Sequence, residues 1–127
     1  MAVKPLAVGS SFKRSVLNKE AGSKILRNVR ESEGFHFYLA IGEPTGETAV
    51  SLEDFVGKLA AVEVQSVNFH YKRQDFQKWI REVLGDAELA LRLKRIGRIG
   101  LSIRGEALRS EILRTVKGRL NELKAAQ

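Results

Sequence analysis

The sequence lacks cysteine and long apolar runs. Without cysteine the chain cannot form disulfide bonds, thiolate metal sites or thiol nucleophiles. Its longest uncharged run, residues 34–42, has nine residues, whereas a membrane-spanning helix needs about 20 apolar residues. Lys4 and Pro5 interrupt the apolar residues near the start of the chain, so we expect no signal peptide. These absences predict a soluble, cytoplasmic protein with no membrane partner.

Residues suited to catalysis or metal binding are few. The two histidines are His36 and His70, and neither has the close His, Asp or Glu spacing that is typical of metal sites. His70 and Asp75 are five residues apart, which would place them on different faces of a continuous helix. Asp75 also stands where a helix is expected to begin, so we expect it to act as a cap. We therefore predict a non-enzymatic protein that uses no cofactor and no metal.

Positive charge is abundant and unevenly distributed. The 127 residues carry a net charge of +7, made up of +4 in residues 1–34, −4 in residues 35–90 and +7 in residues 91–127. All aromatic residues except Phe12 lie in the middle range. A net positive field attracts polyanions whatever the fold. An aromatic, slightly acidic centre between two basic ends therefore favours a nucleic-acid partner.

From residue 51 onward, apolar residues recur at the spacing of amphipathic helices. A last helix is predicted over residues 106–124, and Gly85 is expected to end an earlier one. The predicted fold class is mainly α, a compact bundle of about five short helices. The expected N-terminal caps or first residues of the other helices are Ser51, Ser66, Asp75 and Asp86.

The first third of the chain is predicted to be a basic helical arm. Apolar residues in the range 11–31 have helical spacing, with Gly22 between two groups. This pattern predicts two short helices, or one interrupted helix, with Ser23 as a cap of the second. We therefore divide the chain into a basic arm, residues 1–34, and a helical domain, residues 35–127. The arm either packs on the domain or becomes ordered on a partner.

Residues 34–48 are expected to be extended rather than helical. In the sequence FHFYLA, residues 35–40, large apolar side chains alternate with the others, which predicts a short strand or extended segment. The following sequence EPTG, residues 43–46, has proline and glycine at positions that favour a turn. It lacks the Gly-Lys-Ser/Thr ending of a phosphate-binding loop.

The aromatic run SVNFHYKRQDFQKWI, residues 66–80, has two interpretations. Exposed aromatic rings beside lysine and arginine could stack on bases, as in proteins that bind single strands. However, Phe76 and Trp79 share a helical stripe with Ile80 and Val83, and large aromatic side chains dominate the cores of small domains. We therefore predict that this run contributes mainly to the core.

The same run resembles a known family. Its motif is Phe69-His70-x-x-Arg73-x-Asp75-Phe76-x-x-Trp79-Ile80, accompanied by SLEDF, LGDAELA and GEALRSEILRTVKGRLNEL. This motif is similar to the central signature of an uncharacterised, largely archaeal domain of unknown function. The resemblance covers residues 35–124 and leaves the arm outside. It implies an archaeal source and a shared Arg73/Asp75 feature, most simply an ion pair and a cap that join two helices. It implies no activity and no partner.

The basic segment LKRIGRIGLSIRG, residues 93–105, is the main candidate for phosphate contact. Its first half is explained by a helix end with Gly97 as C-cap, where cations gain about 0.3–1 kcal/mol from the helix dipole. No helix end requires Arg98 and Arg104, which lie beside glycines. Arginine makes bidentate phosphate contacts, and glycine lets the backbone approach. Arg114, Lys117 and Lys124 share an arc of the last helix that could extend this surface.

We predict a non-enzymatic protein that binds the phosphate backbone of nucleic acid. Structured RNA, including a ribosomal surface, is favoured over duplex DNA, because irregular basic arms suit irregular RNA. A solvated basic face remains the alternative explanation, as do the ion-pair networks of thermophiles. The alternative function is a protein-interaction module whose arm docks on an acidic partner or forms a homodimer. The predicted contact residues are Arg95, Arg98, Arg104, Arg114 and Lys117, with Lys13, Arg14, Lys24, Arg27 and Arg30 as a second contact.

Overall fold

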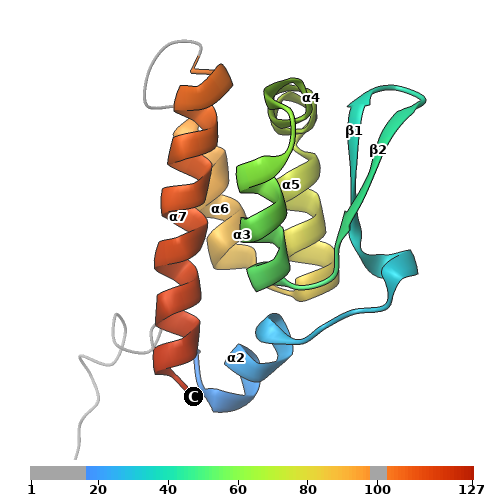
Figure 1. The fold of residues 1–127 in the computed structure, drawn as a ribbon. Coiled ribbons are helices and arrows are strands. Elements are labelled where there is room, and N and C mark those ends of the chain that lie inside the picture. The colour runs from blue at the N-terminus through green and yellow to red at the C-terminus, as the bar shows by residue number, and fades with distance from the viewer. Residues whose placement is uncertain (1–16, 98–102) are drawn as a thin grey trace, which may run out of the picture.

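Helices make up most of the protein, and one β-hairpin accompanies them (Figure 1). The computed structural model describes residues 17–97 and 103–127. The predicted fold class, mainly α with one extended aromatic segment, is confirmed. The elements in chain order are α2 (Lys19–Leu26), the 3-10 helix η1 (Glu31–Glu33), β1 (Phe35–Ala40), β2 (Glu43–Ala49), α3 (Leu52–Ala61), α4 (Val64–Arg73), α5 (Asp75–Trp79), the π-helix η2 (Ile80–Leu84), α6 (Ala87–Ile96) and α7 (Gly105–Ala125).

The long helix α7 contacts four other helices. It packs against α2, α3, α4 and α6 (Figure 1). Its buried apolar residues recur at spacings of three and four, so one stripe of the helix faces the core along its whole length. No helix within residues 17–97 and 103–127 combines the length and the apolar character needed to cross a membrane. The buried apolar residues of α7 are Leu108, Ile112, Val116, Leu120 and Leu123.

Several predicted helix boundaries are confirmed. The Ser51 hydroxyl accepts a hydrogen bond from the Asp54 N–H at 3.0 Å and caps α3. An Asp86 carboxylate oxygen accepts one from the Leu89 N–H at 3.1 Å and caps α6. Gly85 adopts a left-handed conformation with φ of 86°, which ends η2. These ends follow directly from local sequence, because each uses a side chain or a glycine within one turn of the boundary.

Two predicted caps are wrong. Ser66 lies inside α4, where its buried hydroxyl has no hydrogen-bond partner among the described residues. Packing of α4 against both β1 and α7, rather than a capping side chain, fixes where this helix begins. Ser23 lies inside α2, whose cap is Asn18. Gly22 does not interrupt α2, because it is buried and lets the helix approach the end of α7 closely.

The hairpin begins as predicted but turns earlier. β1 and β2 pair antiparallel, with Ala40 opposite Glu43, so the turn is at Ile41 and Gly42. Gly42 has a φ of 77°, which glycine adopts without strain. The predicted EPTG turn is wrong, because residues 43–46 belong to β2 and Pro44 lies opposite Tyr38. Proline fits there because β2 is an edge strand with an irregular register.

Aromatic rings from β1, α3 and α5 meet at the centre of the core. The Phe35 ring lies 5.1 Å from Phe76 and 5.8 Å from both Phe55 and Trp79, measured between ring centroids. The prediction that Phe76 and Trp79 belong to the core is confirmed, since both are buried. The Trp79 indole N–H donates to the Glu33 carbonyl at 2.9 Å. This bond ties the segment before the hairpin to α5.

Gly34 is expected to resist replacement by alanine. A Cβ atom at this position would lie 2.7 Å from both the Ala49 carbonyl oxygen and the Thr48 Cγ2. Gly34→Ala should therefore lower the free energy of unfolding by about 1–3 kcal/mol through overpacking, as measured by urea denaturation. Gly57→Ala is the matched control on α3, where no atom lies within 4 Å of the new Cβ, and it should not destabilise. Equal stability of Gly34→Ala and the parent protein would contradict this expectation.

Candidate functional site

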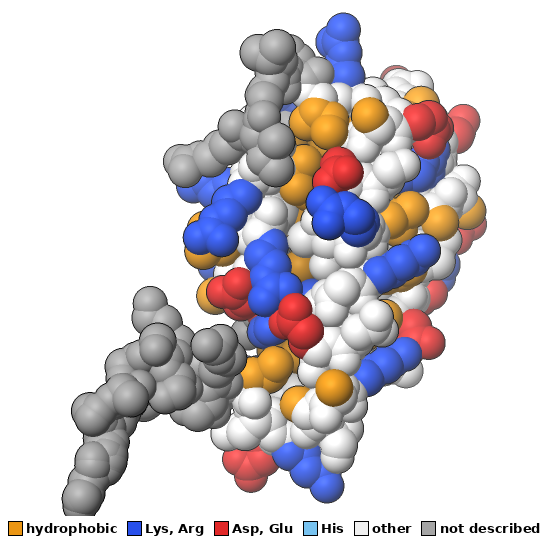
Figure 2. Space-filling model, turned by 90° about the vertical axis from the view of Figure 1, so that its left-hand side faces the viewer, with side chains coloured by type: hydrophobic (Ala, Val, Ile, Leu, Met, Phe, Trp, Pro, Cys, Tyr) orange, Lys and Arg blue, Asp and Glu red, His pale blue; other side chains and the backbone are white. Residues whose placement is uncertain are grey.

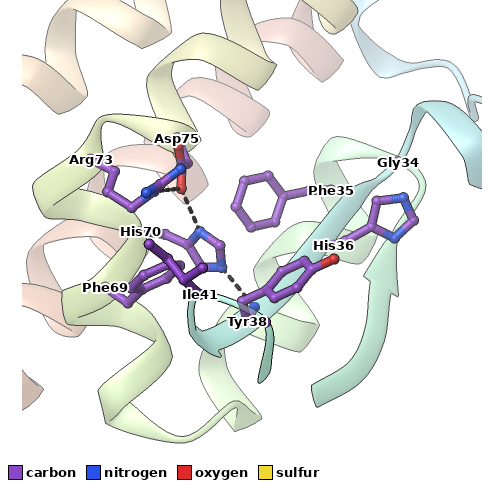
Figure 3. Close-up of a pocket in the computed structure, with 10 residues that line it drawn as sticks. Gly34, Phe35, His36, Tyr38, Ile41, Phe69, His70, Arg73 and Asp75 are labelled. Atoms are coloured by element: carbon purple, nitrogen blue, oxygen red, sulfur yellow. Dashed lines mark hydrogen bonds and ion pairs between the residues drawn. The ribbon is translucent and has the colours of Figure 1, made fainter. Parts of the chain in front are cut away.

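A pocket lies between the tip of the hairpin and the C-terminal half of α4 (Figure 3). It has a volume of about 370 Å³ and is open to solvent. Apolar and aromatic side chains form most of its lining, and one ion pair lies at its edge. The lining residues are Gly34, Phe35, His36, Tyr38, Ile41, Gly42, Phe69, His70, Arg73 and Asp75.

A break between α4 and α5 brings His70 and Asp75 together. Gln74 has a φ of 63°, a left-handed conformation that is uncommon for a residue other than glycine. The chain therefore does not continue as one helix, and the Asp75 carboxylate lies 2.8 Å from His70 Nδ1. The expectation that the two side chains occupy different faces is wrong, because it assumed a continuous helix. Asp75 makes no capping bond at the start of α5 either, since its carboxylate binds His70 and Arg73 instead.

Both ring nitrogens of His70 are occupied. Its Nε2 lies 2.8 Å from the backbone nitrogen of Tyr38 and accepts that N–H. Nδ1 therefore carries the proton and donates to Asp75. Burial lowers the pKa of His70 below its ordinary value of 6.5, while the hydrogen bond to Asp75 acts in the opposite direction. His70 is thus a neutral side chain that links β1 to α4 and α5, and neither nitrogen is free to act as a base.

Arg73 is held at the edge of the pocket. Its Nε donates to Asp75 at 3.0 Å, and its guanidinium carbon lies 5.0 Å from the centre of the Phe69 ring. The predicted Arg73/Asp75 ion pair is therefore confirmed, and the predicted cap is not. The two terminal amino groups of Arg73 make no hydrogen bond to the described residues, and half of the side chain, 51%, is exposed. The ion pair therefore orients a guanidinium whose outer donors remain available.

Many of the lysine and arginine side chains of residues 91–127 form ion pairs with carboxylates of the same protein. Arg119 is buried and forms two hydrogen bonds with the buried Asp86, at 2.8 and 3.0 Å. Arg114, a predicted contact residue, pairs with Glu111 at 2.5 Å. The prediction that α7 contributes to a phosphate-binding surface therefore loses support. Ion pairs within the protein neutralise part of the positive charge of residues 91–127. The other paired cations of residues 91–127 are Arg92, Arg109 and Lys124.

A second group of cations remains without a carboxylate partner among the described residues. Lys94 and Arg95 lie in the last turn of α6, Arg104 precedes α7, and Lys72 lies near the end of α4. All are exposed. We call these residues, Lys72, Lys94, Arg95 and Arg104, the basic end.

Hydrogen bonds join the three helix ends that carry the basic end. The Tyr71 hydroxyl donates to the Leu93 carbonyl at 2.7 Å and accepts the Gly97 N–H at 2.8 Å. Burial raises the pKa of Tyr71, so the hydroxyl keeps the proton that it donates. The Gly105 N–H donates to the Asn68 side chain at 2.8 Å. α4 thus contacts both the end of α6, where Gly97 is the predicted C-cap, and the start of α7.

The remaining predicted contact residues are dispersed. Lys117 is exposed on α7 and has no ion pair with a described residue. Arg27 donates to the Val83 carbonyl at 2.9 Å, and Arg30 lies 3.6 Å from Glu33. These two and Lys24 belong to the region of α2, which lies at the opposite end of the molecule from the basic end (Figure 1). On the face seen in Figure 2, lysine and arginine alternate with acidic side chains. The predicted contact residues Lys13, Arg14 and Arg98 lie outside the described residues.

Sequence reasoning missed part of both sites. Lys72 lies in a segment of negative net charge, and Lys94 lies in the last turn of a predicted helix, where the helix dipole alone explains a cation. Tyr38 and Phe69 were not predicted to share a pocket, because they are far apart in the sequence. The signal that could have found them is the motif of residues 69–75, whose histidine binds the hairpin backbone. Among the described residues, no group of three or more His, Asp or Glu could hold a metal ion.

Comparisons with protein-family models, curated proteins and solved structures give no match. The resemblance to an archaeal domain of unknown function therefore stays a prediction.

Proposed function

We propose that the protein is a non-enzymatic nucleic-acid-binding protein that contacts the phosphate backbone through its basic end. The observation that carries this proposal is the group of exposed, unpaired cations at the joined ends of α4, α6 and α7. Elsewhere along α7 the arginines have carboxylate partners within the protein. Lys19, Lys24, Lys78 and Lys117 also form no ion pair with described residues, but they lie outside the basic end. Several unpaired cations on adjoining helix ends favour a polyanion more than single unpaired cations do.

Arg104 supports the proposal most directly. It occupies the N-cap position of α7, a helix of 21 residues, where the helix dipole opposes a cation by about 0.3–1 kcal/mol. Serine or aspartate at this position, in place of Arg104, would stabilise the helix by capping it. A phosphate at this position would instead be favoured by the arginine and by the positive end of the helix dipole, although the Gly105 N–H already donates to Asn68. The arrangement suits anion binding better than it suits helix stability.

Structured RNA is the favoured partner. Sequence-specific readers of duplex DNA insert a helix or a two-stranded ribbon into the major groove. The basic end is instead built from the C-terminal ends of α4 and α6 and from the start of α7, and α6 and α7 are packed against the core. Such a surface suits the irregular backbone of folded RNA, for example a ribosomal surface. The alternative of an arm that docks on a protein partner gains no support from α2, whose Ile25 is buried in the core of the protein itself.

Neutralising three of the four residues of the basic end is expected to weaken RNA binding, most strongly at low salt. In the triple variant Lys94→Gln, Arg95→Gln and Arg104→Gln, the slope of log affinity against log salt should fall by about 3, or about 1 per lost phosphate contact. The measurement is a titration of a stem-loop RNA between about 50 and 300 mM salt. The melting temperature should change little, because all three side chains are exposed.

A matched variant separates position from net charge. Lys19, Lys24 and Lys78 are exposed, form no ion pair with described residues and lie outside the basic end. Replacing these lysines with glutamine removes the same charge and should leave most of the salt slope intact. Equal losses in both variants, or no loss in the first, would contradict the assignment of the contact to the basic end.

A further inference from the structure

The pocket and the basic end lie on opposite sides of one helix. Phe69 and Arg73 of α4 line the pocket, while Asn68 and Tyr71 bind the start of α7 and the end of α6. Figure 1 shows the hairpin tip, α4 and the facing ends of α6 and α7 at the same end of the molecule. An α-helix is about 10 Å across, so a path around half of it is about 16 Å long. About five nucleotides cover this path at a strand rise of 3.4 Å each. A strand bound at the basic end can therefore reach the pocket.

We propose that the pocket binds one unpaired nucleobase of an RNA, with an adjacent phosphate on Arg73. This inference rests on the proposed function, because it assigns a second contact to the same bound strand. It also names the class of RNA, since a base must be unpaired and turned out of its stack to enter the pocket. A loop or a bulge meets this requirement, and a continuous duplex does not.

The shape and the lining of the pocket suit a planar ring. Its volume of about 370 Å³ falls within the usual range for small-ligand sites, about 300–1,000 Å³. Tyr38 and Phe69 are half-buried, and their rings border the same space as His36 (Figure 3). Aromatic rings bind any base through its face, which gives affinity with little sequence preference. Phe35 and His70 lie beneath them as part of the buried core.

The polar groups at the edge of the pocket suit the rest of a nucleotide. Asp75 and the Phe69 ring fix the guanidinium of Arg73, whose outer amino groups can make a bidentate phosphate contact. The Oδ1 atom of Asp75 has no described partner, because its hydrogen bonds use Oδ2. It can therefore accept a hydrogen bond from a base amino group. An acidic peptide would satisfy Arg73 but would offer no flat ring to the aromatic walls.

The first test uses adenosine 5′-monophosphate as a probe in NMR. Titration of the full chain should shift the backbone amide signals of residues 34–42 and 69–75, and the shifts should saturate. Shifts confined to the basic end, or none at all, would overturn the pocket assignment. The same titration with hexaglutamate should not shift the backbone amide signals of these pocket residues. Pocket shifts with hexaglutamate alone would overturn the nucleobase in favour of an acidic protein segment.

The second test compares a stem-loop RNA with a fully paired duplex of the same stem. Fluorescence of 2-aminopurine at one loop position should be quenched on binding, because the base stacks on an aromatic ring. Ile41, which is 81% exposed at the hairpin tip, allows a variant with little effect on folding. Ile41→Glu and Phe69→Leu should each weaken stem-loop binding by about tenfold and leave duplex binding unchanged. Leu91→Glu is the matched control at the other exposed large apolar residue of the described chain.

These results distinguish the two proposals. If the basic-end variant loses RNA affinity while Ile41→Glu and Phe69→Leu do not, the pocket proposal fails and the proposed function stands. If adenosine monophosphate shifts the pocket signals while the basic-end variant binds RNA normally, the assignment of the phosphate contact fails and the nucleobase site stands. Equal affinity for stem-loop and duplex, without quenching, would overturn the pocket proposal.

Discussion

Arg119→Met is expected to lower the free energy of unfolding by about 3–5 kcal/mol, because it would leave a buried carboxylate without its counter-charge. Asp86 is 2% exposed, and its two oxygens accept hydrogen bonds from Arg119 at 2.8 and 3.0 Å. The Asp86 side chain also caps α6 through the Leu89 N–H. The arginine therefore neutralises the charge at a point where α6 and α7 meet, and urea denaturation of the variant measures this contribution.

Removing the carboxylate as well should restore much of the loss. In the double variant Asp86→Ser with Arg119→Met, serine keeps a capping oxygen and no charge remains buried. The double variant should therefore be more stable than Arg119→Met alone. Arg114→Met on the same helix is the control, because its exposed ion pair with Glu111 contributes little to stability. If the double variant is no more stable than the single one, an unpaired buried charge is not the cause.

Replacing His70 is expected to have the second-largest effect. His70→Ala removes a ring that is 4% exposed, leaves the Tyr38 N–H without its acceptor, and leaves Asp75 with Arg73 alone. We expect a loss of about 2–4 kcal/mol in the free energy of unfolding, from the cavity and from the unsatisfied N–H. His36→Ala is the control, because this exposed histidine binds only Thr48. Equal stability of the two variants at neutral pH would contradict the role assigned to His70.

The same histidine should make the folded protein sensitive to acid. Burial lowers the pKa of His70 below 6.5 in the folded state, so the unfolded chain binds a proton at a higher pH than the folded protein does. Its contribution is therefore complete above pH 6.5 and is lost as the pH falls towards the lowered pKa. Unfolding in urea between about pH 5 and 8 should show this slope, and His70→Gln should flatten it. A slope that persists in His70→Gln would place the titrating group elsewhere.

Local sequence predicted most of the helices, but it failed where tertiary contacts determine the boundary of a helix. Ser51, Gly85 and Asp86 mark boundaries through bonds or conformations within one turn. Ser66 looked equally suitable as a cap, but packing of its helix on the hairpin and α7 moved the boundary. The left-handed Gln74 gave no signal at all, because glycine or asparagine is the usual residue in that conformation.

The positive charge of the candidate site could be predicted from the sequence, but the ion pairs among its charged residues could not. The excess of positive charge after residue 90 is visible in the sequence. The sequence does not show which cations remain unpaired. The paired residues are too far apart in the chain, since Arg119 and Asp86 are separated by 33 residues and Arg92 and Glu122 by 30. Helical periodicity describes neighbours within a few turns and carries no information about such partners. The pocket could not be predicted either, because the residues of the hairpin and of α4 that line it are far apart in the sequence.

The irregular strand β2 also has a consequence for self-association. An edge strand with regularly spaced free N–H groups is a template for another strand and promotes aggregation. In β2, Pro44 has no N–H to offer, and the Glu47 N–H is taken by the Thr45 hydroxyl at 3.0 Å. The register shifts opposite residues 36–40 further bend the strand. These features make β2 a poor template for pairing with the same strand of a second copy.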